Sequence, residues 1–128
     1  MNTDGSEGLE SDLVKRKQVN LAIDWEHLHQ ISDGNAEFER ELLQIFVEDT
    51  HDHLKEAQAA LLKGDYDAVS REAHHFKGAS ANVGLIEMQA IAGKLETDAH
   101  AKQLSEAAVM LAELTDSLQD VQAFLNQA

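Results

Sequence analysis

One stretch of this sequence combines residue types that could carry out group-transfer chemistry on the surface of a helix. Residues 73–84 contain His74, which is followed one turn later by Lys77 and Gly78. At helical spacing Phe76 falls on the face that carries the other apolar residues, whereas His74 and Gly78 fall together on the opposite face. The stretch therefore predicts an exposed histidine with a lysine and a glycine beside it.

An imidazole in this setting is suited to nucleophilic attack on phosphorus. Histidine is largely uncharged near neutral pH, so one ring nitrogen keeps a free lone pair. Lys77 can place its ammonium beside an oxyanion on His74, and phosphoryl transfer depends mainly on positioning and on such charges. A glycine inside a helix costs about 1 kcal/mol relative to alanine, and Gly78 does not face the core. We therefore expect Gly78 to leave room for a second molecule at His74.

Other residues near this stretch are expected to play smaller roles. If the next helix runs antiparallel, Glu96 can accept a hydrogen bond from the second ring nitrogen of His74 and fix its tautomer. An ordinary surface carboxylate is the alternative for Glu96. His75 points to another side of the helix and is expected to be a solvated neighbour. Ser80 and Asn82 are expected to have structural roles.

The elements that must position these residues are helices. The chain has no proline, lacks runs of alternating β-branched and polar residues, and is rich in helix-forming residues. Apolar periodicity and chain breaks predict a short helix after the N-cap Asp24 and longer helices over about residues 36–62, 67–82, 86–101 and 105–125. Because short links make successive helices antiparallel neighbours, we expect an all-α, antiparallel up-down four-helix bundle with a short extra N-terminal helix.

The chain is expected to divide into a tail and one domain. Residues 1–20 are predicted to form a flexible acidic N-terminal tail, because their low hydrophobicity cannot offset the entropy lost on ordering, and residues 21–128 to form the bundle. The first residues lack the basic start and apolar run of a secretion signal. No stretch reaches the roughly 18 apolar residues of a membrane span. These features favour a cytoplasmic protein.

The charge and the missing residue types exclude several classes of function. The formal net charge is −14 at pH 7, which repels nucleic acid and anionic membrane surfaces. We therefore expect neither as a partner. The chain has no cysteine, so it has no disulfide, thiolate metal site or cysteine nucleophile.

The stretch around His74 resembles the signature of a known family. The sequence HHFKG at residues 74–78, with Gly84 ten residues after His74, is similar to the histidine–x–hydrophobic–Lys–Gly motif of histidine phosphotransfer domains in two-component phosphorelays. The resemblance extends over about residues 23–125. It implies that His74, and not His75, is the phosphoacceptor.

The resemblance also implies a mechanism and partners. Lys77 and Gly78 would assist transfer, while Glu96 and Gly84 stand at supporting positions; relatives often carry glutamine or glutamate where Glu96 stands. Such domains relay the phosphoryl group to or from the aspartate of a response-regulator receiver domain and receive it from a sensor histidine kinase. They have no kinase or ATP site of their own, and the chain has no glycine-rich phosphate loop. We expect a monomeric phosphocarrier without a cofactor.

Two alternatives belong to other classes of function. Di-iron bundles use Glu-x-x-His pairs that point into the core, and this spacing occurs at residues 26–29, 48–51 and 72–75. The second and third pairs fall outside the apolar faces of their helices, so no metal site is expected. The other alternative is a structural adaptor, which would bind a receiver without accepting phosphate.

Overall fold

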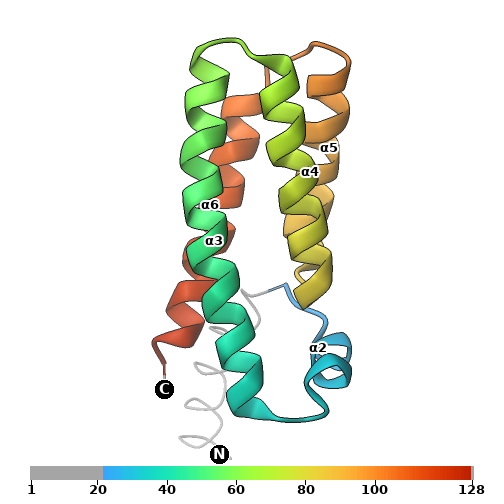
Figure 1. Ribbon diagram of the computed structural model, residues 1–128, viewed down its shortest axis with the longest axis vertical. Coiled ribbons are helices and arrows are strands. Elements are labelled where there is room, and N and C mark those ends of the chain that lie inside the picture. The colour runs from blue at the N-terminus through green and yellow to red at the C-terminus, as the bar shows by residue number, and fades with distance from the viewer. Residues whose placement is uncertain (1–21, 128) are drawn as a thin grey trace, which may run out of the picture.

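The computed structural model describes residues 22–127 of the chain, and the predicted tail over residues 1–20 lies outside them. The helices are α2 (Trp25–Ser32), α3 (Ala36–Leu62), α4 (Tyr66–Val83), α5 (Ile86–His100) and α6 (Ala107–Leu125). Each of the four long helices packs against the next, and α6 returns to pack against α3 (Figure 1). The predicted antiparallel four-helix bundle with a short leading helix is confirmed. Within the described part, no helix has the length and hydrophobicity needed to cross a membrane.

Short polar side chains begin the first three of these helices, and the predicted N-cap Asp24 is one of them. Asp24, Asn35 and Asp65 each accept a hydrogen bond from a backbone N–H three residues later, at 3.0–3.1 Å. Such caps satisfy backbone donors that a helix leaves unpaired at its N-terminus. Because these caps flank tight breaks in the chain, the observed helix bounds lie within about two residues of the predicted ones.

Gly84, at the end of α4, lies against the start of α2. Its backbone has a φ of +79°, in the left-handed region, and a Cβ there would lie 2.9 Å from the carbonyl oxygen of Asp24. The N–H of Asp24 donates to the carbonyl of Gly84 at 2.7 Å. A residue with a side chain would be strained and would also collide with Asp24. Gly84 therefore fixes where α4 ends and where α2 begins.

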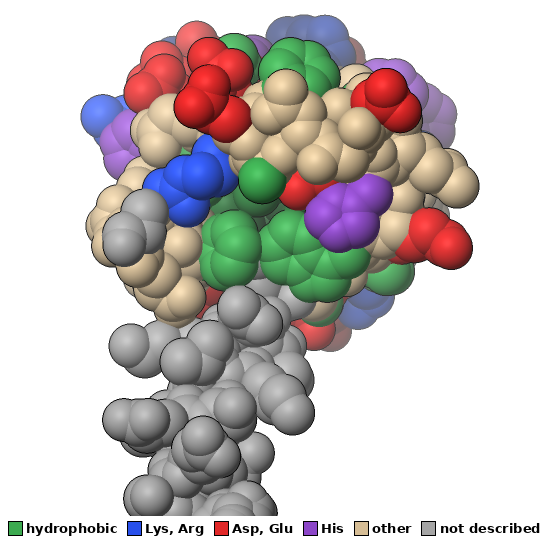
Figure 2. Space-filling view, turned by 90° about the horizontal axis from the view of Figure 1, so that it is seen from below, with side chains coloured by type: hydrophobic (Ala, Val, Ile, Leu, Met, Phe, Trp, Pro, Cys, Tyr) green, Lys and Arg blue, Asp and Glu red, His purple; other side chains and the backbone are tan. Residues whose placement is uncertain are grey.

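Helix α2 covers one end of the bundle. Leu28 is fully buried, and the Trp25 ring lies 5.3 Å from the ring of Phe124 on α6. The buried Glu39 at the start of α3 accepts hydrogen bonds from His29 and from Ser32. Seen from this end, acidic side chains lie around the rim and hydrophobic side chains lie nearer the centre (Figure 2). These contacts anchor α2 to both α3 and α6.

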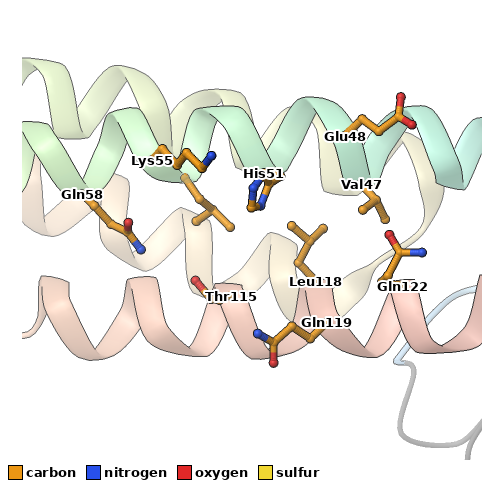
Figure 3. Close-up of a pocket in the computed structure, with 10 residues that line it drawn as sticks. Val47, Glu48, His51, Lys55, Gln58, Thr115, Leu118, Gln119 and Gln122 are labelled. Carbon is orange, nitrogen blue, oxygen red and sulfur yellow. The ribbon is translucent and has the colours of Figure 1, made fainter.

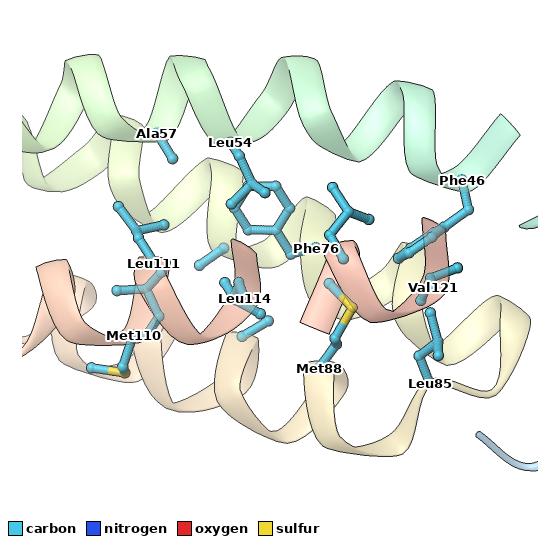
Figure 4. Close-up of a cluster of buried hydrophobic side chains, with 14 of the residues drawn as sticks. Phe46, Leu54, Ala57, Phe76, Leu85, Met88, Met110, Leu111, Leu114 and Val121 are labelled. Carbon is cyan, nitrogen blue, oxygen red and sulfur yellow. The ribbon is translucent and has the colours of Figure 1, made fainter. Parts of the chain in front are cut away.

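The core runs the length of the bundle and includes the inner face of α4 (Figure 4). On α4 and α6, every residue predicted to face inward is buried. Helical spacing in the sequence predicts that Leu42, His53 and Leu61 face the core from α3. This is partly wrong, because these three are only half-buried whereas Leu43 and Val47 are buried. Helix α3 contacts α2, α4 and α6, so its buried face is wider than a single stripe.

Candidate functional site

His74 lies in the middle of α4 and faces away from the core. Its side chain is 71% exposed. The residues Ala73 and Phe76 on either side of it are fully buried. The backbone beneath His74 is therefore held by core packing, while the imidazole itself is open to another molecule.

Glu96 on α5 connects the two polar side chains of the predicted site. One carboxylate oxygen lies 2.8 Å from Nδ1 of His74, and the other lies 2.7 Å from the ammonium of Lys77. The structure thus brings His74, Lys77 and Glu96 together across the α4–α5 interface. Because Glu96 is only 24% exposed, its two contacts are partly shielded from water.

The charge state of Glu96 determines which nitrogen of His74 is free. The hydrogen bond from Lys77 lowers the pKa of Glu96; burial opposes this effect and the hydrogen bond with His74 adds to it. An ionised carboxylate can only accept hydrogen bonds. Nδ1 of His74 must then be the donor, and the lone pair of the neutral ring is on Nε2. The geometry therefore presents Nε2 as the nucleophilic atom.

Two glycines shape the surface beside these groups. A Cβ added at Gly78 would meet no atom of the described chain within 4 Å, so packing within the chain does not require a glycine there. Gly93 on α5 was not identified from the sequence. A Cβ at Gly93 would lie 3.5 Å from Cδ of Lys77, so Gly93 lies directly beneath the lysine stem. Its signal in the sequence is a glycine inside a helix, three residues before Glu96 and on the same face.

The remaining residues that the sequence singled out lie elsewhere. Gly84 is at the C-terminus of α4 and makes no contact with the imidazole. Ser80 is fully buried in the core. His75 was predicted to be a solvated neighbour, and this is only partly so. Its side chain is 37% exposed, but its Nε2 lies 2.8 Å from a carboxylate oxygen of Asp49 and its ring stacks on His53 at 3.8 Å. Helix α3 passes along this flank of α4 and supplies both partners.

The Glu-x-x-His pairs do not form a metal site in the core. Residues 26, 29, 48, 51 and 75 include none that is buried, and Glu72 is half-buried at the α3–α4 interface. Glu48 and His51 instead line a groove of about 510 Å³ between α3 and α6 (Figure 3). None of the residues around His74 contributes to this groove.

Comparisons with known proteins agree with this geometry. The family model of the Hpt domain matches residues 41–124, which is more than half of the chain. The phosphorelay intermediate protein rdeA of Dictyostelium discoideum is 26% identical over 99 residues. That match covers 77% of this chain and 39% of rdeA, so the chain spans well under half the length of that relative.

Two solved structures have the same fold. Histidine-containing phosphotransfer protein B (HptB) from Pseudomonas aeruginosa PAO1 superposes with a TM-score of 0.77 at 27% identity, over 83% of this chain and 92% of that one. The HPT domain of a sensor hybrid histidine kinase from Shewanella superposes with a TM-score of 0.68 at 18% identity, over 84% of this chain and 93% of that one. The second match supports the fold alone.

Proposed function

Because this chain belongs to the Hpt domain family, a family of phosphotransfer proteins in two-component phosphorelays, we propose that His74 is the residue that carries the phosphoryl group. The observation that supports this assignment most strongly is the state of its ring. The imidazole is 71% exposed and Nδ1 is bonded to Glu96, which leaves Nε2 free to react. His75 on the same helix has its Nε2 hydrogen-bonded to Asp49, so this nitrogen is not free in the way that Nε2 of His74 is.

The transfer step follows from the free lone pair. Nε2 of His74 attacks the phosphorus of an aspartyl phosphate on a receiver domain, and the bond between phosphorus and the aspartate oxygen breaks. The aspartate leaves as a carboxylate with the electron pair. The imidazole, which keeps its proton on Nδ1, becomes cationic, and the ionised Glu96 stabilises that charge. The reverse reaction returns the phosphoryl group to a receiver aspartate.

Lys77 and Gly78 support the same step in different ways. The Lys77 side chain is 40% exposed, and its ammonium is held near the imidazole through Glu96. From there it can stabilise the oxygens of the transferred group. Gly78 has open space where a side chain would be, so we assign it to clearance for the receiver.

This function needs partners that supply the rest of the chemistry. We propose that a sensor histidine kinase, directly or through its own receiver, provides the phosphoryl group and that a response-regulator receiver exchanges it. The carrier itself has neither a kinase activity nor an ATP site. We assign the function to residues 21–128, acting as a monomer in the cytoplasm.

Labelling of single histidine variants tests this proposal. The wild type, His74→Gln and His75→Gln would each be incubated with the phosphorylated kinases and receivers of the source organism. We expect acid-labile label on the wild type and on His75→Gln, and none on His74→Gln. Far-UV circular dichroism checks that each variant is folded. Label that persists on His74→Gln would refute the assignment, and binding of a receiver without any label on the wild type would favour an adaptor.

A further inference from the structure

A second group of polar side chains lies on the other flank of α4, where α3 runs beside it (Figure 1). Asp49 and His53 come from α3, one turn apart, and Glu72 and His75 come from α4. None of these residues contacts His74 or Glu96 through a hydrogen bond or ion pair in the described structure. The phosphotransfer chemistry proposed above therefore leaves this group unused.

Both imidazoles of this group point the same nitrogen at one carboxylate. Nε2 of His75 lies 2.8 Å from Oδ2 of Asp49, and Nε2 of His53 lies 3.6 Å from Oδ1 of the same residue. The two rings are stacked, with centroids 3.8 Å apart and an angle of 29° between their planes. One ligand atom from each of the three residues lies within 4.8 Å of the other two.

Glu72 holds His53 in the orientation that metal-binding histidines commonly have. Its carboxylate lies 2.7 Å from Nδ1 of His53 and its side chain is only 19% exposed. A carboxylate on one ring nitrogen fixes the tautomer, so that the other nitrogen presents its lone pair. For His53 that other nitrogen is Nε2, the atom nearest Asp49.

The local charge also favours a cation. Asp49, Glu56 and Glu72 all lie within 4.0 Å of a histidine nitrogen, and within residues 22–127 no lysine or arginine forms an ion pair with them. Three neighbouring carboxylates repel one another unless positive charge lies between them. A divalent ion would supply that charge without the close approach of two protonated imidazoles.

We propose that Asp49, His53 and His75 form a binding site for a divalent transition-metal ion of the zinc class. Two imidazole nitrogens and one carboxylate oxygen are ligands that this class accepts, with a fourth position left for water. Ligand atoms of tetrahedral zinc lie about 3.3 Å apart, from metal–ligand distances of about 2.0–2.1 Å. The distances of 2.8 and 3.6 Å, which run to the two different oxygens of Asp49, bracket this value. The two stacked rings, now 3.8 Å apart, must swing apart for both Nε2 atoms to face one ion.

This site differs from the core metal site that the sequence analysis excluded. A core site would use Glu-x-x-His pairs that lie within one helix and point into the core. Here Asp49 and His53 are one turn apart on α3, and the third ligand, His75, comes from α4 across the interface. Only the packing of the two helices brings these three residues together.

Titration of the full chain with zinc chloride tests the site without any kinase or receiver. After removal of metal with a chelator, isothermal calorimetry of the wild type is expected to show uptake of one equivalent of Zn²⁺ and a higher thermal midpoint with zinc present. His53→Gln, His75→Gln and Asp49→Asn are expected to lose that uptake. His51→Gln, which removes an exposed histidine of α3 outside the group, is expected to retain it.

Two further measurements distinguish loss of a ligand from loss of the fold. Glu72→Gln keeps all three ligands and is expected to weaken zinc binding by about tenfold or more, because it loosens His53. Co²⁺ in place of zinc is expected to give the visible absorption of a four-coordinate site, which disappears in the Asp49→Asn variant while its circular dichroism stays helical. No stoichiometric uptake by the wild type, or uptake that is unchanged in folded His53→Gln and Asp49→Asn, would overturn the proposal.

Discussion

Adjacent histidines on α4 have opposite surroundings. His74 faces α5, where a single carboxylate binds Nδ1 and the rest of the ring is exposed. His75 faces α3, where Asp49 binds Nε2 and His53 covers one side of the ring. Nε2 of His74 therefore has no hydrogen-bond partner in the described structure, whereas Nε2 of His75 is already hydrogen-bonded to Asp49. The contrast shows that the neighbouring helix, rather than the residue type, decides what each histidine can do.

The sharpest test of this contrast is to fill the open space beside His74. Replacing Gly78 with leucine is expected to slow exchange with a receiver strongly, because a Cβ there meets nothing in the described chain and the longer side chain would meet the docking partner. The helix is expected to become more stable by up to about 1 kcal/mol. Transfer rates and urea unfolding measure the two effects. Ala90→Leu, at an exposed position of α5, is the matched control, and an unchanged transfer rate in Gly78→Leu would contradict the clearance role.

Removing the charge of Glu96 is expected to have the next largest effect. Glu96→Gln keeps the shape of the side chain but loses the anion that fixes Nδ1 and stabilises the cationic ring. We expect transfer to fall about 10–100-fold, as for other residues that orient a reactive histidine. Glu56→Gln makes the same chemical change on the α3 flank and is expected to leave the rate unchanged. Equal rates in both variants would remove the distinction between the flanks.

Lys77→Ala is expected to slow transfer by a smaller factor than Glu96→Gln does. A hydrogen bond to a charged group contributes about 1.5 kcal/mol, which corresponds to roughly tenfold in rate. The fold should be retained, because the Lys77 side chain is at the surface. Rapid-quench kinetics on wild type, Lys77→Ala and Lys77→Arg would measure the loss and show whether arginine restores the rate. A rate equal to wild type in Lys77→Ala would exclude a role for the ammonium.

The smallest expected effect is on how the stability of the fold depends on pH. The pKa of Glu96 is lower in the folded chain, chiefly because of Lys77. Its contribution is therefore present above the unfolded value of about 4.5 and is lost as pH falls through the lower folded value. Wild type should exceed Glu96→Gln in stability at pH 7, by less than about 1 kcal/mol, and this difference should shrink by pH 3. Urea unfolding at both pH values measures it, and a difference that grows at low pH would contradict this sign.

Most of the fold follows from local sequence features. Asn35, Asp65 and Gly84 mark where helices begin or end, and the apolar residues of α4 and α6 repeat with a clear helical period. These signals act within a few residues, so they can be recognised in one chain. The face of α3 was harder to predict because α3 contacts three other helices, and periodicity alone does not reveal how many helices surround an element.

In the candidate site too, features within one helix could be predicted more readily than contacts between helices. His74, Lys77 and Gly78 share one turn of a helix, and their spacing alone indicated an exposed group. The position of Glu96 beside His74 could be anticipated because α4 and α5 are joined by a tight turn at Gly84. The surroundings of His75 follow from the same kind of geometry and were missed. Helices α3 and α4 also join at a short turn, and His53 lies as far before Gly64 as His75 lies after it. Gly93 was missed because its role depends on a contact between helices. It lies on α5 beneath the side chain of Lys77, which belongs to α4.

The junction at Gly84 has a consequence for how this domain can be attached to other proteins. Because Asp24 is bonded to Gly84, the chain enters the bundle about 15 Å along α4 from His74, at 1.5 Å per residue. Anything linked before Ile23 is therefore attached at the end of the bundle where α4 ends. A tether of this kind raises the effective concentration of a linked partner, while the exposed His74 stays open to partners that diffuse freely.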